Sequence, residues 1–154
     1  MTRTYAGIGY RWTPPGVCSI MGNLAADFRR RGFLLRSGGR GNADKAFERG
    51  AAGQCGIFDP NGATPEALKL AEQFHPAWHA CDNFARRAHG RNMFILLGRE
   101  LCDPVDFVVC FTIDGRASGG TGQAMRAAEF YGIPVFNLHD PTALDRLLTH
   151  AARR

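Results

Sequence analysis

The order of local patterns along the chain predicts an α/β fold. Strand-like and helix-like segments alternate as β-α-β-α-β, followed by a helical region and then by β-α-β-α. Such alternation is typical of parallel strands joined by crossover helices. Three glycine-rich turns, at residues 7–9, 37–41 and 118–122, each lie between a strand-like and a helix-like run. We therefore expect residues 1–154 to form one domain with a three-layer, Rossmann-like architecture, in which helices flank a mostly parallel sheet of about five strands.

Strands are expected where short apolar runs lie between glycine, proline and other turn residues. The run Asp106–Ile113 is the most apolar and is therefore expected to be the central strand. Asp59-Pro60-Asn61-Gly62 is a strong turn signal that ends an earlier strand. In order, the expected strands are residues 4–9, 33–37, 55–58, 106–113 and 133–137.

Helices are expected where apolar residues recur every three or four positions, as Ile20 and Leu24 do. Gly32 and Gly132 each end such a pattern, and Pro65 lies at the first position of another. The expected helices are residues 17–31, 42 or 43 to 51, 64–74, 77–98 with a candidate break at Gly90, 121–131 and 141–152.

The composition is that of a globular chain, with 45% hydrophobic and 21% charged residues. No apolar run approaches the ~20 residues that span a bilayer, and no secretory signal is recognised before Gly7. The five cysteines are scattered without a CxxC pair, which favours reduced thiols and a cytoplasmic location. The net charge of +5 is carried mostly by arginine, which suits phosphate, but the arginines are spread along the chain rather than gathered in one motif.

The glycine-rich turns predict an anion site. In a parallel sheet, strand-to-helix turns meet at the carboxyl edge of the strands. Turns without Cβ atoms let backbone N–H groups approach a ligand, and the helix N-termini that follow add positive charge. A nucleotide or sugar phosphate is therefore the expected ligand. In the first turn, Gly7 and Gly9 allow the reversal and Arg11 reaches toward the phosphate; alternatively, these glycines only let a helix pack closely on a strand.

The second turn contributes five candidate ligand-binding residues: Ser37, Gly38, Gly39, Asn42 and Asp44. Asp44 either stabilises the helix N-terminus as a first-turn acid or accepts hydrogen bonds from ribose hydroxyls. Glu48, one helical turn further, either joins the pocket or pairs with Lys45.

The third turn and the strand before it contribute six more: Thr112, Ser118, Gly119, Gly120, Thr121 and Gly122. Free N–H groups in this loop are expected to form an anion-binding nest, to which Ser118 and Thr121 add hydroxyl donors. Arg126, inside the following helix, either contacts the phosphate or forms a surface ion pair with Glu129.

Two further groups of polar residues lie in the helical region. Arg91 and Asn92 are placed to close over a bound base or sugar, or else mark only a helix break with surface polar groups. His75, His79 and Cys81 suggest a metal, but Pro76 disrupts the i,i+4 helical spacing of the two histidines. We therefore expect neither a metal site nor a cofactor. The apolar helices in residues 77–98 suggest a homodimer.

Together these segments resemble the SLOG superfamily, the Rossmann-like group that contains DNA-processing protein A and the Lonely Guy phosphoribohydrolases. The segment 37–44, Ser-Gly-Gly-Arg-Gly-Asn-Ala-Asp, resembles the Ser-Gly-x-Ala-x-Gly-x-Asp segment of DNA-processing protein A, and Arg91-Asn92 resembles its Arg-Asn block. Residues 118–122 are similar to the Pro-Gly-Gly-x-Gly-Thr loop of the phosphoribohydrolases. The resemblance covers nearly the whole chain and is closest to small stand-alone SLOG proteins of phages and mobile elements.

The resemblance implies three candidate functions. The first is binding of a nucleotide or a nucleotide-derived signal. The second is hydrolysis of the N-glycosidic bond of nucleoside 5′-monophosphates; at the positions that correspond to the phosphoribohydrolase motif, this chain has Gln123 and Arg126 instead of the catalytic glutamate. Glu129 and Glu48 are then the candidate catalytic acids, with Asp44 as a further substitute. The third is binding of single-stranded DNA, which is expected to depend on salt.

Overall fold

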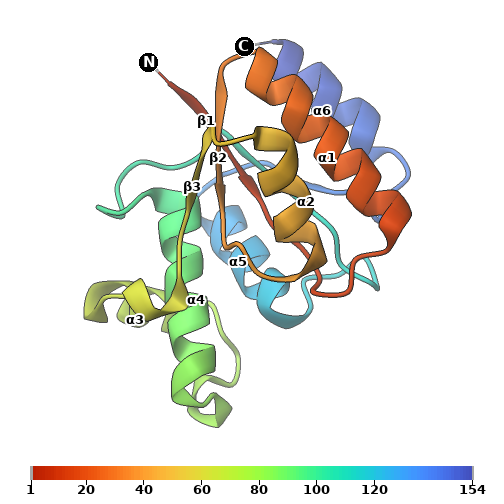
Figure 1. Cartoon of the computed structure of the whole chain (residues 1–154). Helices are drawn as coiled ribbons and strands as arrows, with labels where there is room; N and C mark the ends of the chain where they lie inside the picture. Colours follow the sequence, from red (N-terminus) through yellow and green to blue (C-terminus); the bar gives the residue numbers. More distant parts are fainter. Residues whose placement is uncertain (1, 154) are drawn as a thin grey trace.

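The computed structural model describes residues 2–153 and shows five strands in one parallel sheet, in the order β3-β2-β1-β4-β5 (Figure 1). The strands are β1 (Arg3–Gly7), β2 (Phe33–Ser37), β3 (Cys55–Ile57), β4 (Phe107–Cys110) and β5 (Val135–Asn137). The helices are α1 (Pro15–Arg30), α2 (Gly41–Ala51), α3 (Pro65–Glu72), α4 (Asn83–Leu97), α5 (Gly119–Phe130) and α6 (Ala143–Ala152). Two short 3₁₀ turns are Pro60–Gly62 and Trp78–Ala80.

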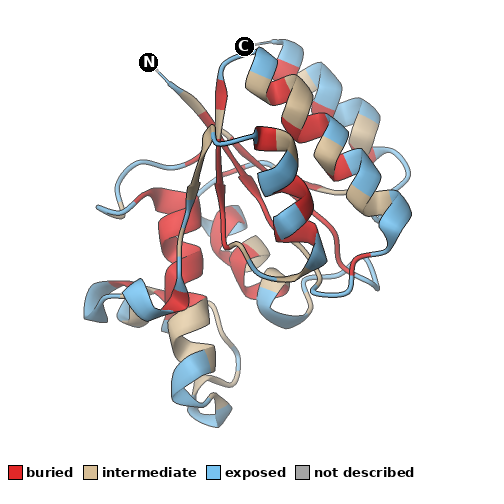
Figure 2. Ribbon diagram, in the orientation of Figure 1, coloured by how far each residue is buried: buried red, intermediate tan, exposed pale blue. Residues whose placement is uncertain are grey.

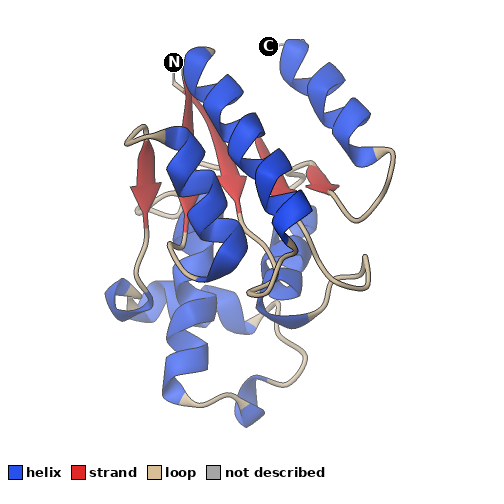
Figure 3. Cartoon of the chain, turned by 45° about the vertical axis from the view of Figure 1, so that its right-hand side comes forward, coloured by secondary structure: helices blue, strands red, loops and turns tan. Residues whose placement is uncertain are grey.

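The helices form a layer on each face of the sheet. Helices α1, α2 and α6 cover one face, while α4 and α5 cover the other, with α3 packed against α4 (Figures 1 and 3). Each face has its own apolar core. Tyr5, Phe28 and Phe107 belong to the core on the α1 side, and Met93, Ile95 and Val108 belong to the core on the α4 side. The predicted fold class is confirmed.

Strand order explains where a ligand can bind. From β1 the chain builds outward to β2 and β3, then crosses to β4 and β5 on the other side of β1. In open α/β sheets the loops on either side of such a reversal diverge and leave a crevice at the carboxyl edge. The loops after β1 and β4 flank this point, because Tyr5 of β1 pairs with Phe107 of β4.

The structure corrects three details of the sequence analysis. The central strand is β1, and β4 is the buried strand beside it. Strands β1 and β4 end at Gly7 and Cys110, earlier than expected, so the residues after them belong to the edge loops. Helix α4 continues through Gly90 and is not broken there. The glycine allows α3 to pack closely, since a Cβ atom at this position would lie only 3.0 Å from Leu68 Cδ2.

The fold bears on two expectations, the absence of a membrane-spanning segment and the formation of a homodimer. No helix within residues 2–153 has the length and apolar character that crossing a bilayer requires. The apolar residues 93–97 of α4 are buried within this chain, whereas the first turns of α4 are more exposed (Figure 2). The homodimer thus stays a prediction, without the exposed apolar helix that suggested it.

Two helical glycines provide a test of the packing of α1 on α2. A Cβ atom on Gly50 would lie 2.2 Å from the carbonyl oxygen of Gly22, whereas a Cβ atom on Gly16 would meet nothing within 4 Å. We predict that Gly50→Ala lowers the free energy of unfolding by about 1–3 kcal/mol, because α1 and α2 must separate. Gly16→Ala, the matched control, should be neutral or slightly stabilising, since alanine favours the helix. Urea unfolding of both variants measures this, and equal effects would contradict the packing described.

Candidate functional site

A cleft of about 1210 Å³ lies at the carboxyl edge of the sheet. All three glycine-rich turns contribute to it, and residues of α4 between Phe84 and Ile95 form another wall. The sequence-predicted residues that line it are Gly9, Arg11, Gly38, Gly39, Asp44, Glu48, Arg91, Asn92, Thr112, Ser118, Gly119, Gly120 and Thr121. The fold therefore brings most of the predicted set to one place.

Helix α5 presents free backbone amides to this cleft. Its first internal hydrogen bond runs from the Gly122 amide to the Ser118 carbonyl, so the amides of Gly119, Gly120 and Thr121 precede the helical ladder. The Ser118 hydroxyl donates to Asp114 Oδ1 and does not cap the helix. Gly119 has φ +64°, a left-handed conformation that glycine adopts without strain. This uncapped N-terminus can bind an anion.

Helix α2 begins differently, because Asp44 occupies its N-terminal end. Oδ2 of Asp44 accepts a hydrogen bond from the Arg40 amide at 3.1 Å, and the Asn42 amide donates to the Arg11 carbonyl. The predicted structural role of Asp44, a first-turn acid, is confirmed. Burial raises the pKa of this carboxyl to about 7, although the Arg40 hydrogen bond and the positive charge of Arg91 favour ionisation. A carboxyl group that titrates near neutral pH can both accept and release a proton under ordinary conditions.

Arg91 joins the α4 wall to the sheet edge. Its guanidinium NH1 donates to the carbonyl oxygens of Gly38 and Phe58, both at 3.0 Å, and its Nε donates to Asn92 Oδ1. A Cβ atom on Gly38 would lie 2.4 Å from this NH1, so glycine is required for the guanidinium to enter. Burial lowers the pKa of Arg91, and the nearby carboxyl of Asp44 acts in the opposite direction.

Asn92 positions the start of α5. Its Nδ2 donates to the Gly120 carbonyl and to Oε1 of Gln123, a side chain that is completely buried. Gln123 Nε2 in turn donates to the Ala71 carbonyl, which lies in α3. Gln123 is thus a structural link between three helices and not a group that a ligand can reach.

The charges in the cleft are mixed. Basic side chains come from Arg11, Arg40, Lys45 and Arg91, and acidic ones from Asp44, Glu48 and Asp59. The carboxyl groups Asp44 and Glu48 lie on α2, while the free amides lie on α5. The α5 amides can therefore bind an anionic group of a ligand, and the α2 carboxyl groups can accept hydrogen bonds from donor groups of the same ligand.

Three predicted residues of the first two turns contact other protein atoms and do not line the cleft. A Cβ atom on Gly7 would fall within 2.5 Å of the Phe47 ring, which supports the alternative that this glycine permits close helix packing. Ser37 is buried and donates through its hydroxyl to the Gly7 carbonyl at 2.6 Å. Asn42 is exposed and contacts the Thr13 carbonyl.

Three predicted residues of α5 also lie outside the cleft. Gly122 is buried against Ala117. Arg126 donates to the carbonyls of Phe74 and Ala117, so its guanidinium fastens α5 to neighbouring loops. Glu129 is exposed and does not line the cleft. Of the two predicted catalytic acids, Glu48 is the one that lines it.

Sequence reasoning missed several residues of the site, chiefly Arg40, Lys45, Asp59 and Phe84. Arg40 lies between Gly39 and Gly41 in the second glycine-rich turn, and this position is a sequence signal that could have placed it in the site. Phe84 has no comparable signal, because its approach to Arg40, with the guanidinium 5.4 Å from the ring centroid, depends on how α4 packs.

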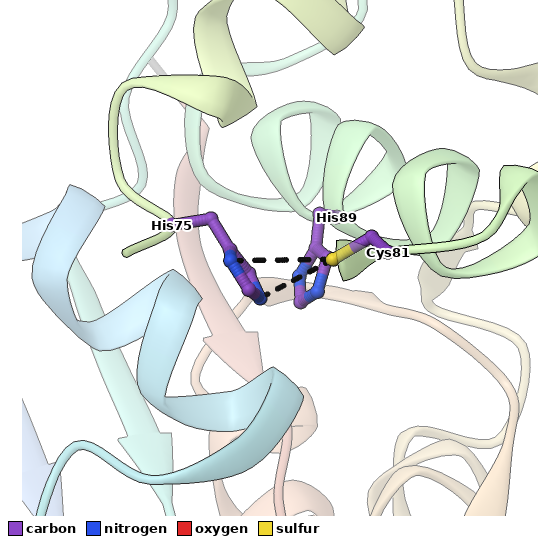
Figure 4. Close-up of side chains that lie close together, drawn as sticks. All are labelled: His75, Cys81 and His89. Carbon is purple, nitrogen blue, oxygen red and sulfur yellow. Dashed lines mark hydrogen bonds between the residues drawn. The ribbon is translucent and has the colours of Figure 1, made fainter. Parts of the chain in front are cut away.

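A second polar cluster lies beside the cleft. The expectation of no metal site was drawn from His75 and His79, but His79 is exposed and the fold instead brings His89 of α4 next to His75 and Cys81 (Figure 4). His89 also lines the cleft. Pro76 disrupts the helical spacing of His75 and His79, but this has no bearing on His75, Cys81 and His89, which meet through tertiary contacts.

Comparisons of this chain with models of protein families, with curated proteins and with solved structures find no match. The site is therefore interpreted from its own geometry and chemistry.

Asp44 should make stability depend on pH. The pKa of Asp44 in the folded protein, about 7, lies above the ordinary aspartate value of 3.8. The native state therefore keeps a proton that the unfolded state releases between these two values. The free energy of unfolding should then fall as the pH rises from about 4 to 7, by up to about 4 kcal/mol. Asp44→Asn, which retains an oxygen for the Arg40 amide, should lose this component. Urea unfolding at several pH values measures the difference, and identical pH profiles for the two proteins would contradict it.

Proposed function

We propose that the cleft binds a nucleotide or nucleotide-derived ligand, with its phosphate on the α5 N-terminus and its ribose near α2. The observation that carries the proposal is the convergence of the three turns on one cleft whose α5 end has uncapped amides. A phosphate group can accept hydrogen bonds from the amides of Gly119, Gly120 and Thr121 and is attracted by the helix dipole.

The opposite side of the cleft suits a sugar. Asp44 and Glu48 offer carboxyl oxygens one helical turn apart on α2, and such oxygens accept hydrogen bonds from ribose hydroxyls. Ile57, Phe84 and Ile113 also line the cleft and remain substantially exposed. These apolar side chains can cover the faces of a base.

The resemblance to the SLOG superfamily supports the same ligand class. The segments that carry it, residues 37–44, 91–92 and 118–122, each contribute residues to the cleft. Gly38 and Arg91, which belong to two of these segments, are in direct contact. Membership of the superfamily is part of the proposal.

The α5 amides can be tested by a single change at Thr121. Thr121→Asp places a carboxylate in the first turn of α5, which favours the helix but repels a phosphate. We predict that it weakens binding of nucleoside 5′-monophosphates at least about tenfold while leaving or raising the melting temperature. Isothermal titration calorimetry with nucleoside monophosphates, ribose 5-phosphate and unphosphorylated nucleosides measures the effect.

Thr121→Asn is the matched control, because it has nearly the same shape as the aspartate variant without the charge. It should bind phosphorylated ligands close to the wild-type level. Absence of binding by the wild-type chain, or equal binding of phosphorylated and unphosphorylated ligands, would overturn the proposal.

A second candidate function is hydrolysis of the bound nucleotide at its N-glycosidic bond, and the elevated pKa of Asp44 favours it. In this reaction the bond between C1′ and the base breaks, water adds to C1′, and the base leaves with a proton. A carboxyl group titrating near neutral pH can supply that proton or take one from water. Glu48 is the second carboxyl group of the cleft on the same helix.

Chromatographic detection of free base tests this activity. Release of base from nucleoside 5′-monophosphates should be lost in Asp44→Asn and reduced in Glu48→Gln, whereas Glu129→Gln, outside the cleft, should retain the wild-type rate. Base release that persists in Asp44→Asn would exclude the assigned role of Asp44, and no release from any common nucleotide would restrict the chain to binding.

A further inference from the structure

Three side chains that commonly ligate metals meet where the α3–α4 loop contacts α4. His75 and Cys81 come from the loop, and His89 comes from the second turn of α4 (Figure 4). One potential ligand atom from each residue lies within 4.8 Å of the others. The Cys81 sulfur is 3.5 Å from His75 Nε2, and the rings of His75 and His89 are 4.6 Å apart between centroids.

His89 provides an independent sign that the cluster is incomplete. The residue is only 8% exposed, and its Nδ1 has no hydrogen-bond partner among residues 2–153, although the Gln123 side chain interacts with the ring. A buried nitrogen without a partner is unfavourable unless another group satisfies it.

We propose that His75, Cys81 and His89 bind a zinc ion. Two imidazoles and a thiolate are nitrogen and sulfur ligands that suit Zn²⁺ and exclude Mg²⁺ and Ca²⁺, which prefer oxygen. The three protein ligands leave the fourth tetrahedral position for water or another small ligand. Because His89 also lines the cleft, the ion would lie beside the proposed nucleotide site.

The observed geometry requires only a small closure. Zinc bonds of about 2.0–2.3 Å in a tetrahedron place ligand atoms roughly 3.3–3.8 Å apart. The separation between Cys81 and His75 already falls in this range, and the whole group must contract by about 1 Å. His75 Nδ1 accepts a hydrogen bond from the Ala77 amide at 3.0 Å. This bond must be released, because a zinc-bound imidazole has one nitrogen on the metal and a proton on the other.

The neighbouring charges set a limit on affinity. Arg126 donates to the Phe74 carbonyl and Arg86 donates to the Trp78 carbonyl, so two cations border the loop that holds His75 and Cys81. Their positive charges disfavour binding of a divalent cation, and the positive charge of Arg91, near His89, has the same effect. Loss of the thiol proton from Cys81 on binding offsets one of the two metal charges.

Cobalt substitution tests the site in the 154-residue chain. Reduced, chelator-treated protein titrated with Co²⁺ should develop a sulfur-to-cobalt charge-transfer band that saturates at one equivalent and disappears when Zn²⁺ is added. Cys81→Ser should abolish the band, and His89→Gln should weaken Zn²⁺ binding by more than the roughly 10–100-fold that follows loss of a supporting contact. Zinc should also raise the melting temperature of the wild-type chain, because the assembled site binds it more tightly than the unfolded chain does.

Matched controls separate this site from adventitious binding. Cys102→Ser removes an exposed cysteine outside the cluster, and His79→Gln removes an exposed histidine of the same loop; both should retain the band and the affinity. Melting without metal establishes that each variant folds. The proposal is overturned if no charge-transfer band forms, if the band survives in Cys81→Ser, or if Cys102→Ser or His79→Gln lowers affinity as much as Cys81→Ser. In that case the three residues form only a hydrogen-bonded cluster.

Discussion

The buried guanidinium of Arg91 is the interaction on which the arrangement of the cleft depends. It joins α4 to the carbonyl oxygens that follow β2 and β3, and thereby fixes the wall of the cleft against the sheet edge. It enters because Gly38 has no side chain to exclude it. Its charge also lies close enough to Asp44 to favour ionisation of that carboxyl, although burial outweighs this effect. Arg91 thus fixes the position of the wall, and its charge moderates the rise in the Asp44 pKa that burial causes.

The two helices that begin at the edge divide the chemistry between them. At the N-terminal end of α2, the Asp44 carboxyl accepts a hydrogen bond from the Arg40 amide and the Arg11 carbonyl accepts one from the Asn42 amide, so the protein itself supplies acceptors there. Helix α5 has no side-chain cap, and its serine is turned away toward Asp114. For the proposed nucleotide ligand, we therefore expect the phosphate at α5 rather than at α2.

The sequence predicted what depends on local pattern and missed what depends on packing. The fold class and the common edge for the three turns follow from alternation and glycine placement, and both appear in the structure. Gly7 and Gly122 resemble ligand-binding glycines in the sequence, yet each makes room for protein atoms, which only the packing reveals. The meeting of His89 with Cys81 is likewise set by how α4 lies against its preceding loop. Binding of single-stranded DNA stays a prediction, because no feature of the cleft distinguishes it.

The most direct test of the central claim is an amide-resolved NMR titration of the wild-type chain with a nucleoside 5′-monophosphate. Saturable shifts are expected, largest at the amides of Gly119, Gly120 and Thr121 and smaller around Asp44. Unphosphorylated nucleoside should leave the α5 amides nearly unchanged. Shifts that saturate elsewhere on the protein, or α5 amides that do not respond to the phosphorylated ligand, would contradict the account.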